Sequence, residues 1–148
     1  MAKSISIQIA DQMVTDLAVS LTGLTPAYTI ARKFVPRKEL ETLSANGPCV
    51  LVAPSQRQGE RDTRGQREYR HSIDIGLIAK LGSDEESDHE QLDKLIEDLT
   101  DWYFTHDLGG DRPETLDSVN SKFLFDPALA EGKIFLSVST LDFLAQRT

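Results

Sequence analysis

Hydrophobic and polar residues follow two different periods along this chain. Apolar residues recur every three or four positions over roughly 6–21 and 83–108, which predicts two long amphipathic helices. Ser4 or Ser6 is a suitable N-cap for the first helix, and Gly23 lies just beyond its last apolar residue. The apolar stripes consist of Ile9, Met13, Leu17 and Leu21 in the first helix and Leu92, Leu95, Ile96, Leu99, Trp102 and Tyr103 in the second.

Other stretches alternate with a period of two, which is typical of half-buried strands. This alternation extends over 27–35, 69–80 and 133–145, and it is strongest in 69–80. The apolar run at 49–54 predicts a buried strand that ends at Pro54. Weaker signals predict a short strand within 118–127, helical turns at 37–43 and 127–132, and a loop at 109–117.

The segment between the strands 49–54 and 69–80 is unusual in both length and charge. The two strands predict a β-hairpin whose loop spans 55–68, whereas ordinary hairpin loops have about two to five residues. Loops longer than about 12–15 residues are usually functional or disordered. The stretch RQGERDTRGQREYR holds five of the nine arginines of the chain: Arg57, Arg61, Arg64, Arg67 and Arg70.

Taken in order, these elements predict a single α+β domain that covers residues 1–148. We expect a mainly antiparallel sheet of about four strands, packed by the two long helices, with the long hairpin loop at 55–68. A hydrophobic content of 39% and a charged content of 27% are those of an ordinary globular protein. The N-terminus lacks the apolar segment of a secretory signal, and no apolar run reaches the roughly 18 residues of a membrane span.

The charge of the chain, −8 in total, is distributed unevenly. Residues 1–54 have five basic and four acidic groups (+1), residues 55–71 have five and three (+2), and residues 72–148 have six and seventeen (−11). The arginine stretch is therefore the one concentrated basic element of an acidic protein. Such asymmetry is informative about binding partners rather than about the fold.

No group of residues in the sequence matches a known catalytic or cofactor motif, so we expect no enzyme activity, no cofactor and no metal site. Cys49 lies in an apolar run, which favours a buried packing role over a nucleophilic one. The acidic run SDEESDHE lies at a helix start, where acids complement the helix dipole. It is either a solvated helix start or an acidic subunit interface formed by Asp84, Glu85, Glu86, Asp88 and Glu90.

The arginine stretch admits three interpretations: a loop that faces a partner or a channel, an exposed loop without a role, or direct recognition of nucleic acid. The third lacks a helix-turn-helix signature, interleaved aromatic residues other than Tyr69, and a basic domain around it. Arginine is better suited than lysine to forked contacts with carboxylates and phosphates, which disfavours a loop without a role. Glu60, Asp62 and Glu68 dilute the positive charge and favour contacts with protein.

The order of these segments resembles that of bacteriophage tail-terminator and tail-completion (neck) proteins. The resemblance depends on arrangement over most of the chain and not on a sharp motif. It is carried by IADQMVTDLAVSL, YTIARKFVPRKELETL, PCVLVAPS, the long polar loop, YRHSIDIGLIAKL, DHEQLDKLIEDLTDWY and KFLFDPALAEGKIFLSVSTLDF.

The resemblance implies a structural virion protein of the tail or neck, present in the host cytoplasm during assembly. Such proteins form rings, commonly hexameric, that bind the last layer of tail-tube subunits, stop polymerisation and join the tail to the head connector. DNA passes through the ring without sequence-specific binding. A head-completion or connector ring is the alternative within this class, and a small cytoplasmic adaptor for an acidic partner is the alternative outside it.

Charge adds a hypothesis to this resemblance. The arginine loop of one subunit meets an acidic surface on a neighbouring subunit or ring, for which the helix start at 84–101 is a candidate. The loop could instead face the adjoining ring or the DNA in the lumen. The sequence does not decide between these contacts, and it gives neither the ring number nor the type of tail.

Overall fold

The computed structural model describes residues 3–20, 28–32, 48–61, 67–80, 85–110, 112–123 and 134–147. The expected helical turns at 37–43 and 127–132 lie outside these ranges. The described elements are α1 (Ile5–Thr15), a π-helical segment η1 (Asp16–Ser20), β1 (Thr29–Arg32), β2 (Cys49–Arg61), β3 (Arg67–Lys80), α3 (Glu85–Thr105), β4 (Thr115–Phe123) and β5 (Ile134–Arg147).

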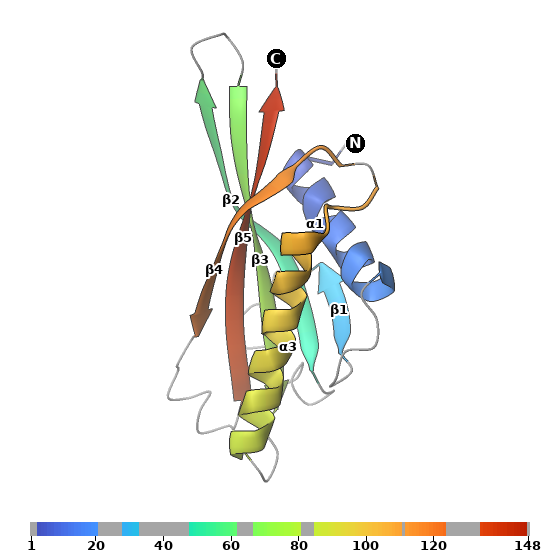
Figure 1. Ribbon diagram of the computed structural model, residues 1–148, viewed down its shortest axis with the longest axis vertical. Coiled ribbons are helices and arrows are strands. Elements are labelled where there is room, and N and C mark those ends of the chain that lie inside the picture. Colours follow the sequence, from blue (N-terminus) through green and yellow to red (C-terminus); the bar gives the residue numbers. More distant parts are fainter. Residues whose placement is uncertain are drawn as a thin grey trace.

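The strands form one five-stranded sheet in the order β1-β2-β3-β5-β4, and α1 and α3 lie on one face of it (Figure 1). The α+β class is therefore right, and most of the pairings are antiparallel as expected, but the sheet has five strands rather than about four and is mixed. β1 pairs parallel to β2, while the other neighbours are antiparallel. A parallel pair needs a connection of about a dozen residues or more, and residues 33–48 provide one. The period of two carries no information on strand direction, which is why it did not predict this pairing.

Both α-helices end earlier than the sequence predicted. Ser4 is the N-cap of α1, where its Oγ accepts a hydrogen bond from the backbone N–H of Ile7 at 3.3 Å. The α-helical part then ends at Thr15 and continues as the π-helical segment to Ser20, with Leu17 still buried. α3 (Glu85–Thr105) ends three residues before the expected 108.

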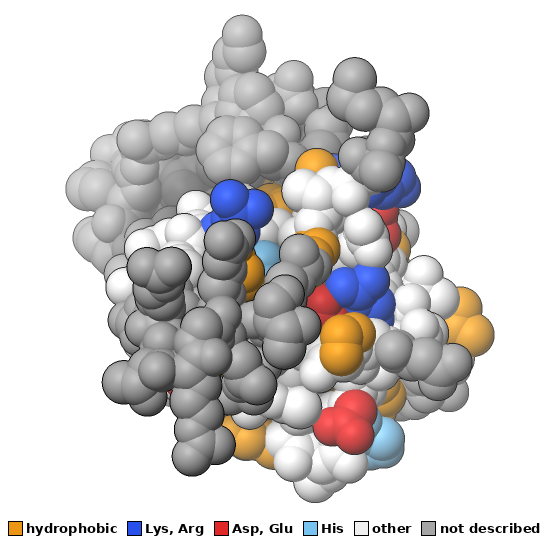
Figure 2. All heavy atoms as spheres, turned by 90° about the horizontal axis from the view of Figure 1, so that it is seen from above, with side chains coloured by type: hydrophobic (Ala, Val, Ile, Leu, Met, Phe, Trp, Pro, Cys, Tyr) orange, Lys and Arg blue, Asp and Glu red, His pale blue; other side chains and the backbone are white. Residues whose placement is uncertain are grey.

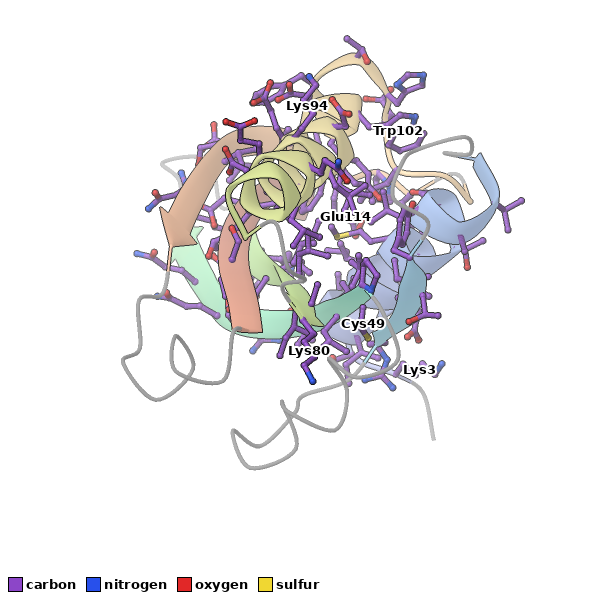
Figure 3. All side chains as sticks on the ribbon, turned by 90° about the horizontal axis from the view of Figure 1, so that it is seen from below. Lys3, Cys49, Lys80, Lys94, Trp102 and Glu114 are labelled. Carbon is purple, nitrogen blue, oxygen red and sulfur yellow. The ribbon has the colours of Figure 1, made fainter. Side chains whose placement is uncertain are left out.

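The core lies between the two helices and the sheet, where Figure 3 shows the side chains filling the space. The predicted stripe of α3 is confirmed, since all its members are buried except Trp102, which is half-buried. Burial of each such aliphatic side chain stabilises the fold by about 1.5–3 kcal/mol. The sheet contributes Val50, Val52, Ile73, Ile75, Leu77, Leu141 and Phe143 from the face that these helices cover.

The β2–β3 hairpin was predicted correctly, but its loop was not. β2 continues seven residues beyond Pro54 to Arg61, and β3 begins at Arg67, so strand pairing extends to Arg61↔Arg67. Only residues 62–66 remain between the strands, and they lie outside the described part. Residues 55–61 are polar on both faces, so they show no hydrophobic alternation although their backbone is extended.

The predicted loop at 109–117 likewise ends earlier, because β4 begins at Thr115. β4 is the short strand expected within 118–127, and it pairs with β5 along one edge of the sheet. Within the described ranges, no helix is both long and apolar enough to cross a membrane.

Candidate functional site

The ends of β2, β3 and β5 extend beyond the two helices and form a projection that we call the arm (Figure 1). We define the arm as residues 55–61, 67–72 and 142–147. It begins at a row of four paired positions that crosses four strands, Gln56↔Ser72↔Asp142↔Ser118. β2 has a register shift between Pro54 and Gln56, and β4 has one between Leu116 and Ser118. Bulges increase the twist of a strand, so both shifts mark the place where the arm turns away from the core.

The bulge in β2 decides which face of the sheet the arginines share. Before it, Val50 and Val52 lie on the face covered by the helices. Strict alternation from Val52 would place position 57 on the opposite face. The extra residue at the bulge shifts the alternation by one position. Arg57 therefore pairs with His71, a buried residue of β3 on the face that the helices cover.

At the end of the arm, three arginines occupy one row across three strands. Arg61 pairs with Arg67, and Arg67 pairs with Arg147 of β5. These positions lie on the helix-side face, in phase with Arg57. The arm therefore brings three arginine positions into one row where the strands end.

Behind this row, the helix-side face of the arm is aromatic. The guanidinium carbon of Arg57 lies 5.8 Å from the ring centroid of Tyr69, and the Tyr69 and His71 rings stack at 6.3 Å. Gly59 is directly opposite Tyr69, and a Cβ atom there would lie 3.0 Å from Cε1 of that ring. The glycine thus leaves room for the ring to lie over β2.

Arg70 does not belong to this face. Its Nη1 lies 2.8 Å from Oδ2 of Asp117 and 3.5 Å from Oδ2 of Asp142, both of them across the outer surface of the sheet. Asp142 also accepts hydrogen bonds from the hydroxyls of Ser72 at 2.5 Å and Ser118 at 3.1 Å. Arg70 thus takes part in a polar network within the subunit. That it also faces a partner stays a prediction.

The predicted arginine group is therefore divided by the fold. Arg57, Arg61 and Arg67 share the helix-side face of the arm by register, and Arg57 is exposed. Arg64 lies outside the described residues. Arg147, which the sequence did not associate with the others, joins the row through the pairing of β3 with β5. Only this long-range register reveals it, because Arg67 and Arg147 are far apart in the sequence.

The acidic run lies at the opposite end of the molecule. α3 begins at Glu85 near the end of the subunit that is remote from the arm (Figure 1). Glu85, Glu86 and Asp88 are in its first turn, Glu90 is exposed, and Asp84 is outside the described residues. The structure does not bring the arginines and the acidic run together within one subunit.

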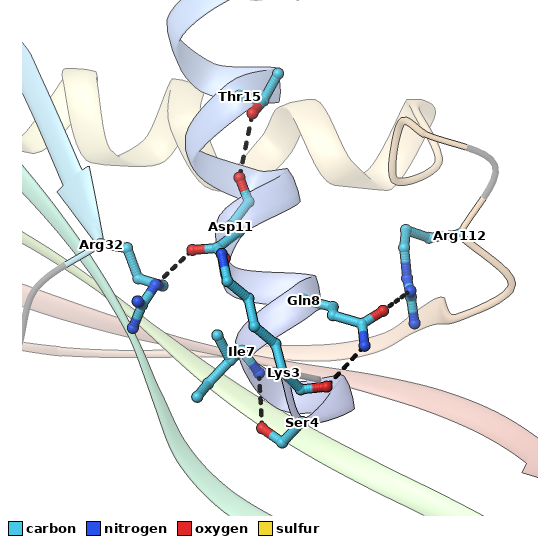
Figure 4. Close-up of polar contacts among 8 residues, drawn as sticks. All are labelled: Lys3, Ser4, Ile7, Gln8, Asp11, Thr15, Arg32 and Arg112. Carbon is cyan, nitrogen blue, oxygen red and sulfur yellow. Dashed lines mark hydrogen bonds and ion pairs between the residues drawn. The ribbon is translucent and has the colours of Figure 1, made fainter. Parts of the chain in front are cut away.

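The remaining charged groups of the described surface mostly form internal pairs, and Figure 2 shows basic side chains directly against acidic ones. Arg32 of β1 forms an ion pair with Asp11, and Arg112 donates to the side chain of Gln8 at 2.6 Å (Figure 4). Burial alone would raise the pKa of Asp11, but the hydrogen bond from Lys3 and the charge of Arg32 outweigh it and lower that pKa. These contacts fasten α1 to the elements beside it.

A buried polar cluster joins the end of α1 to the segment that follows α3. The Asp16 carboxylate, 2% exposed, accepts hydrogen bonds from Gln12 Nε2 at 2.8 Å, the Gly109 N–H at 3.2 Å and the Tyr103 hydroxyl at 3.4 Å. Burial and the neighbouring Asp16 charge raise the pKa of Tyr103 far above its usual range. Among the described residues, no group of three His, Cys, Asp or Glu side chains is placed to hold a metal ion.

Comparison with solved structures gives a match that extends over almost the whole chain. Neither a protein-family model nor a curated protein sequence matches the chain. A solved chain described as "Virion of native gene transfer agent (GTA) particle" has a similar structure, with a TM-score of 0.51 and 14% identity. The match covers 97% of this chain and 98% of that one. At this level of identity, the likeness shows a shared fold along almost the full length of both chains.

Proposed function

We propose that this chain is a structural virion protein, and specifically a tail terminator. Its support is the match along almost the whole of both chains with a chain from a gene transfer agent virion. A match of that extent leaves no further domain in that relative to carry a different activity. The tail-terminator assignment is the finer part of the proposal, and its support is the order of segments in the sequence.

In this proposal, copies of the chain form a ring, commonly hexameric in proteins of this kind, at the end of the tail tube. One face of the ring binds the last layer of tube subunits and stops polymerisation, and the other joins the head connector. DNA passes through the lumen without sequence-specific contacts. This role is mechanical, so it needs no catalytic residue and no cofactor. The protein would lie in the host cytoplasm during assembly and in the virion afterwards.

The charge geometry of the subunit supports a ring. A ring interface is heterologous, which means that each subunit presents two different surfaces to its neighbours. Here the arginine arm and the acidic start of α3 are at opposite ends of one subunit and do not contact each other. Two oppositely charged surfaces that are kept apart within a chain are suited to contacts between chains.

Electron microscopy of particles that lack this subunit tests the proposal. We expect tails of abnormal and variable length that are not joined to heads, because nothing ends tube polymerisation. Purified protein added to polymerising tube subunits should restore a defined length. Tails of normal length that fail to join heads would overturn the terminator role and favour a head-completion ring. Normal, fully joined particles would overturn the virion role altogether and favour a cytoplasmic adaptor.

A further inference from the structure

We infer that the solvent side of α3 binds a basic surface of a different virion protein, with Phe104 as the apolar anchor of the contact. The inference rests on the proposed virion role and adds the chemistry of one partner. Lys94, at the edge of this side, points away from the sheet (Figure 3). We call this side the α3 outer face, and its described residues are Glu90, Asp93, Glu97, Asp101 and Phe104.

Phe104 is an aromatic residue that the core does not use. It is 63% exposed, whereas Tyr103 beside it is only 3% exposed. Within the described ranges, the only other large exposed hydrophobic side chain is Val19. An exposed ring leaves apolar surface in water and contributes nothing to the packing of the fold. Aromatic side chains are enriched at protein interfaces, where they are the commonest anchors.

The Phe104 ring lies at the end of a line of carboxylates. Glu90, Glu97 and Phe104 are spaced by seven residues, which is about two helical turns, so they follow one line along α3. Asp101 precedes Phe104 by three residues and is therefore its neighbour on the helix surface. The line is about 21 Å long, since each helical residue adds 1.5 Å.

The charge of this face is mostly uncompensated within the subunit. Residues 90–105 of α3 have five carboxylates and one lysine, which gives a net charge of −4. Lys94 Nζ lies 3.0 Å from Asp98 and 3.6 Å from Glu97, so the lysine is shared by these two groups. The carboxylates of α3 that form no ion pair in the part of the chain that the structure describes are Glu90, Asp93 and Asp101.

The helix itself does not account for the carboxylate of Asp101. Acidic groups stabilise the first turn of a helix and basic groups stabilise its last turn, because of the helix dipole. The last turn of α3 has no basic residue, and Asp101 comes directly before it. This exposed carboxylate lies near the negative end of the dipole, so α3 gains no stability from it.

A basic protein surface satisfies the ring and the carboxylates together. An arginine or lysine of a partner can lie over the face of Phe104 and donate to the carboxylate of Asp101 or Glu97. Nucleic acid and anionic membranes are excluded as partners, because the same carboxylates repel their phosphates. A second copy of this chain is less suitable than a basic protein, since the chain has 24 acidic and 16 basic residues.

Binding to the tail-tube subunit and to the head-connector subunit of the same particle, each purified, tests the inference. One variant carries Phe104→Ala, and a second carries Glu97→Gln with Asp101→Asn. The control for the first is Val19→Ala, which truncates the other exposed hydrophobic side chain.

The control for the second variant is Thr115→Lys with Asn120→Lys, which raises the net charge by the same two units at exposed positions of β4. Titration calorimetry at low and high salt measures binding to each subunit. Light scattering measures self-association, and urea denaturation shows whether each variant is as stable as the wild type.

We expect the wild type to bind one of the two subunits, and Phe104→Ala to bind it at least about tenfold more weakly with unchanged stability. The Glu97–Asp101 variant should bind about tenfold more weakly at low salt and lose less at high salt, because salt screens the charges that it lacks. Both controls should bind within about twofold of the wild type.

Wild-type binding by both variants of the α3 outer face would overturn the inference and leave the virion role intact. Weaker self-association of Phe104→Ala, with its binding to the two subunits unchanged, would overturn it and assign the face to contacts between copies. A wild-type protein that binds neither subunit would also overturn it. The proposed function fails separately, when particles that lack this chain are normal and fully joined.

Discussion

Arg70 and Asp117 form an ion pair at 2.8 Å that spans the outer face of the sheet from β3 to β4. Asp117 is placed for this contact by the bulge between Leu116 and Ser118, which leaves it without a partner position on β5. The pair fastens edge strand β4 at the level where the arm begins. Because Asp117 lies at the bulge, Arg70 of the basic segment forms an ion pair that holds β4 to the sheet.

We predict that Arg70→Ala lowers the free energy of unfolding by about 0.5–1 kcal/mol, because the lost pair is partly exposed and screened. Urea denaturation at low and high salt measures this, and the loss should shrink as salt is added. The control is Arg57→Ala, whose guanidinium lies over the Tyr69 ring. An equal, salt-dependent loss in that control would contradict the structural role of Arg70.

Removal of the Asp16 carboxylate should lower the free energy of unfolding more than removal of the Arg70 side chain does. The carboxylate is buried and accepts hydrogen bonds from three donors. We predict that Asp16→Ala lowers the free energy of unfolding by about 2–4 kcal/mol, since Gln12, Gly109 and Tyr103 lose their acceptor together. Asp11→Ala is the matched control on the same helix, and its partly exposed ion pairs with Lys3 and Arg32 should each contribute only about 0–1 kcal/mol. Urea denaturation measures both variants. An equal fall in the free energy of unfolding would contradict a special stabilising role of the three hydrogen bonds to Asp16.

The turn after α3 should tolerate no side chain at Gly110. Its φ of 64° is in the left-handed region, and a Cβ atom would collide with the Gln12 side chain. We predict that Gly110→Ala lowers the free energy of unfolding by about 1–2 kcal/mol. In the control Gly76→Ala, the new atom meets Leu51 O at an ordinary 3.9 Å, so the change should be small. Thermal unfolding of both variants provides the measurement.

Ionisation of the buried Tyr103 should make the folded protein less stable at alkaline pH. Burial, and then the charge of Asp16, raise its pKa in the folded state above the unfolded value of about 10. A group with a raised pKa contributes its full stability below the unfolded pKa and loses it as pH rises beyond that value. Stability should therefore fall above about pH 10 more steeply in the wild type than in Tyr103→Phe. Tyrosinate absorbance during an alkaline titration should show Tyr103 ionising only together with unfolding, and its early ionisation would contradict this assignment.

Local sequence patterns were sufficient where one face of an element is covered by the core. The alternation over 69–80 predicted strand β3, and one of the two candidate N-caps, Ser4, begins α1. The same method misplaced the end of β2, because the residues beyond Pro54 have no apolar layer above them. It also missed the parallel pairing of β1, since a pattern along one strand says nothing about the direction of its neighbour.

The candidate site shows the same division more sharply. The sequence by itself determined that arginines concentrate between two strands and that acids concentrate at the start of a helix. Tertiary structure decided which arginine positions share a face: the β2 bulge sets the face of Arg57, the pairing of β3 with β5 adds the position of Arg147, and Arg70 forms an ion pair with Asp117. The physical reason is that charge composition is a local property, whereas shared faces and ion pairs depend on register between strands that are distant in the chain.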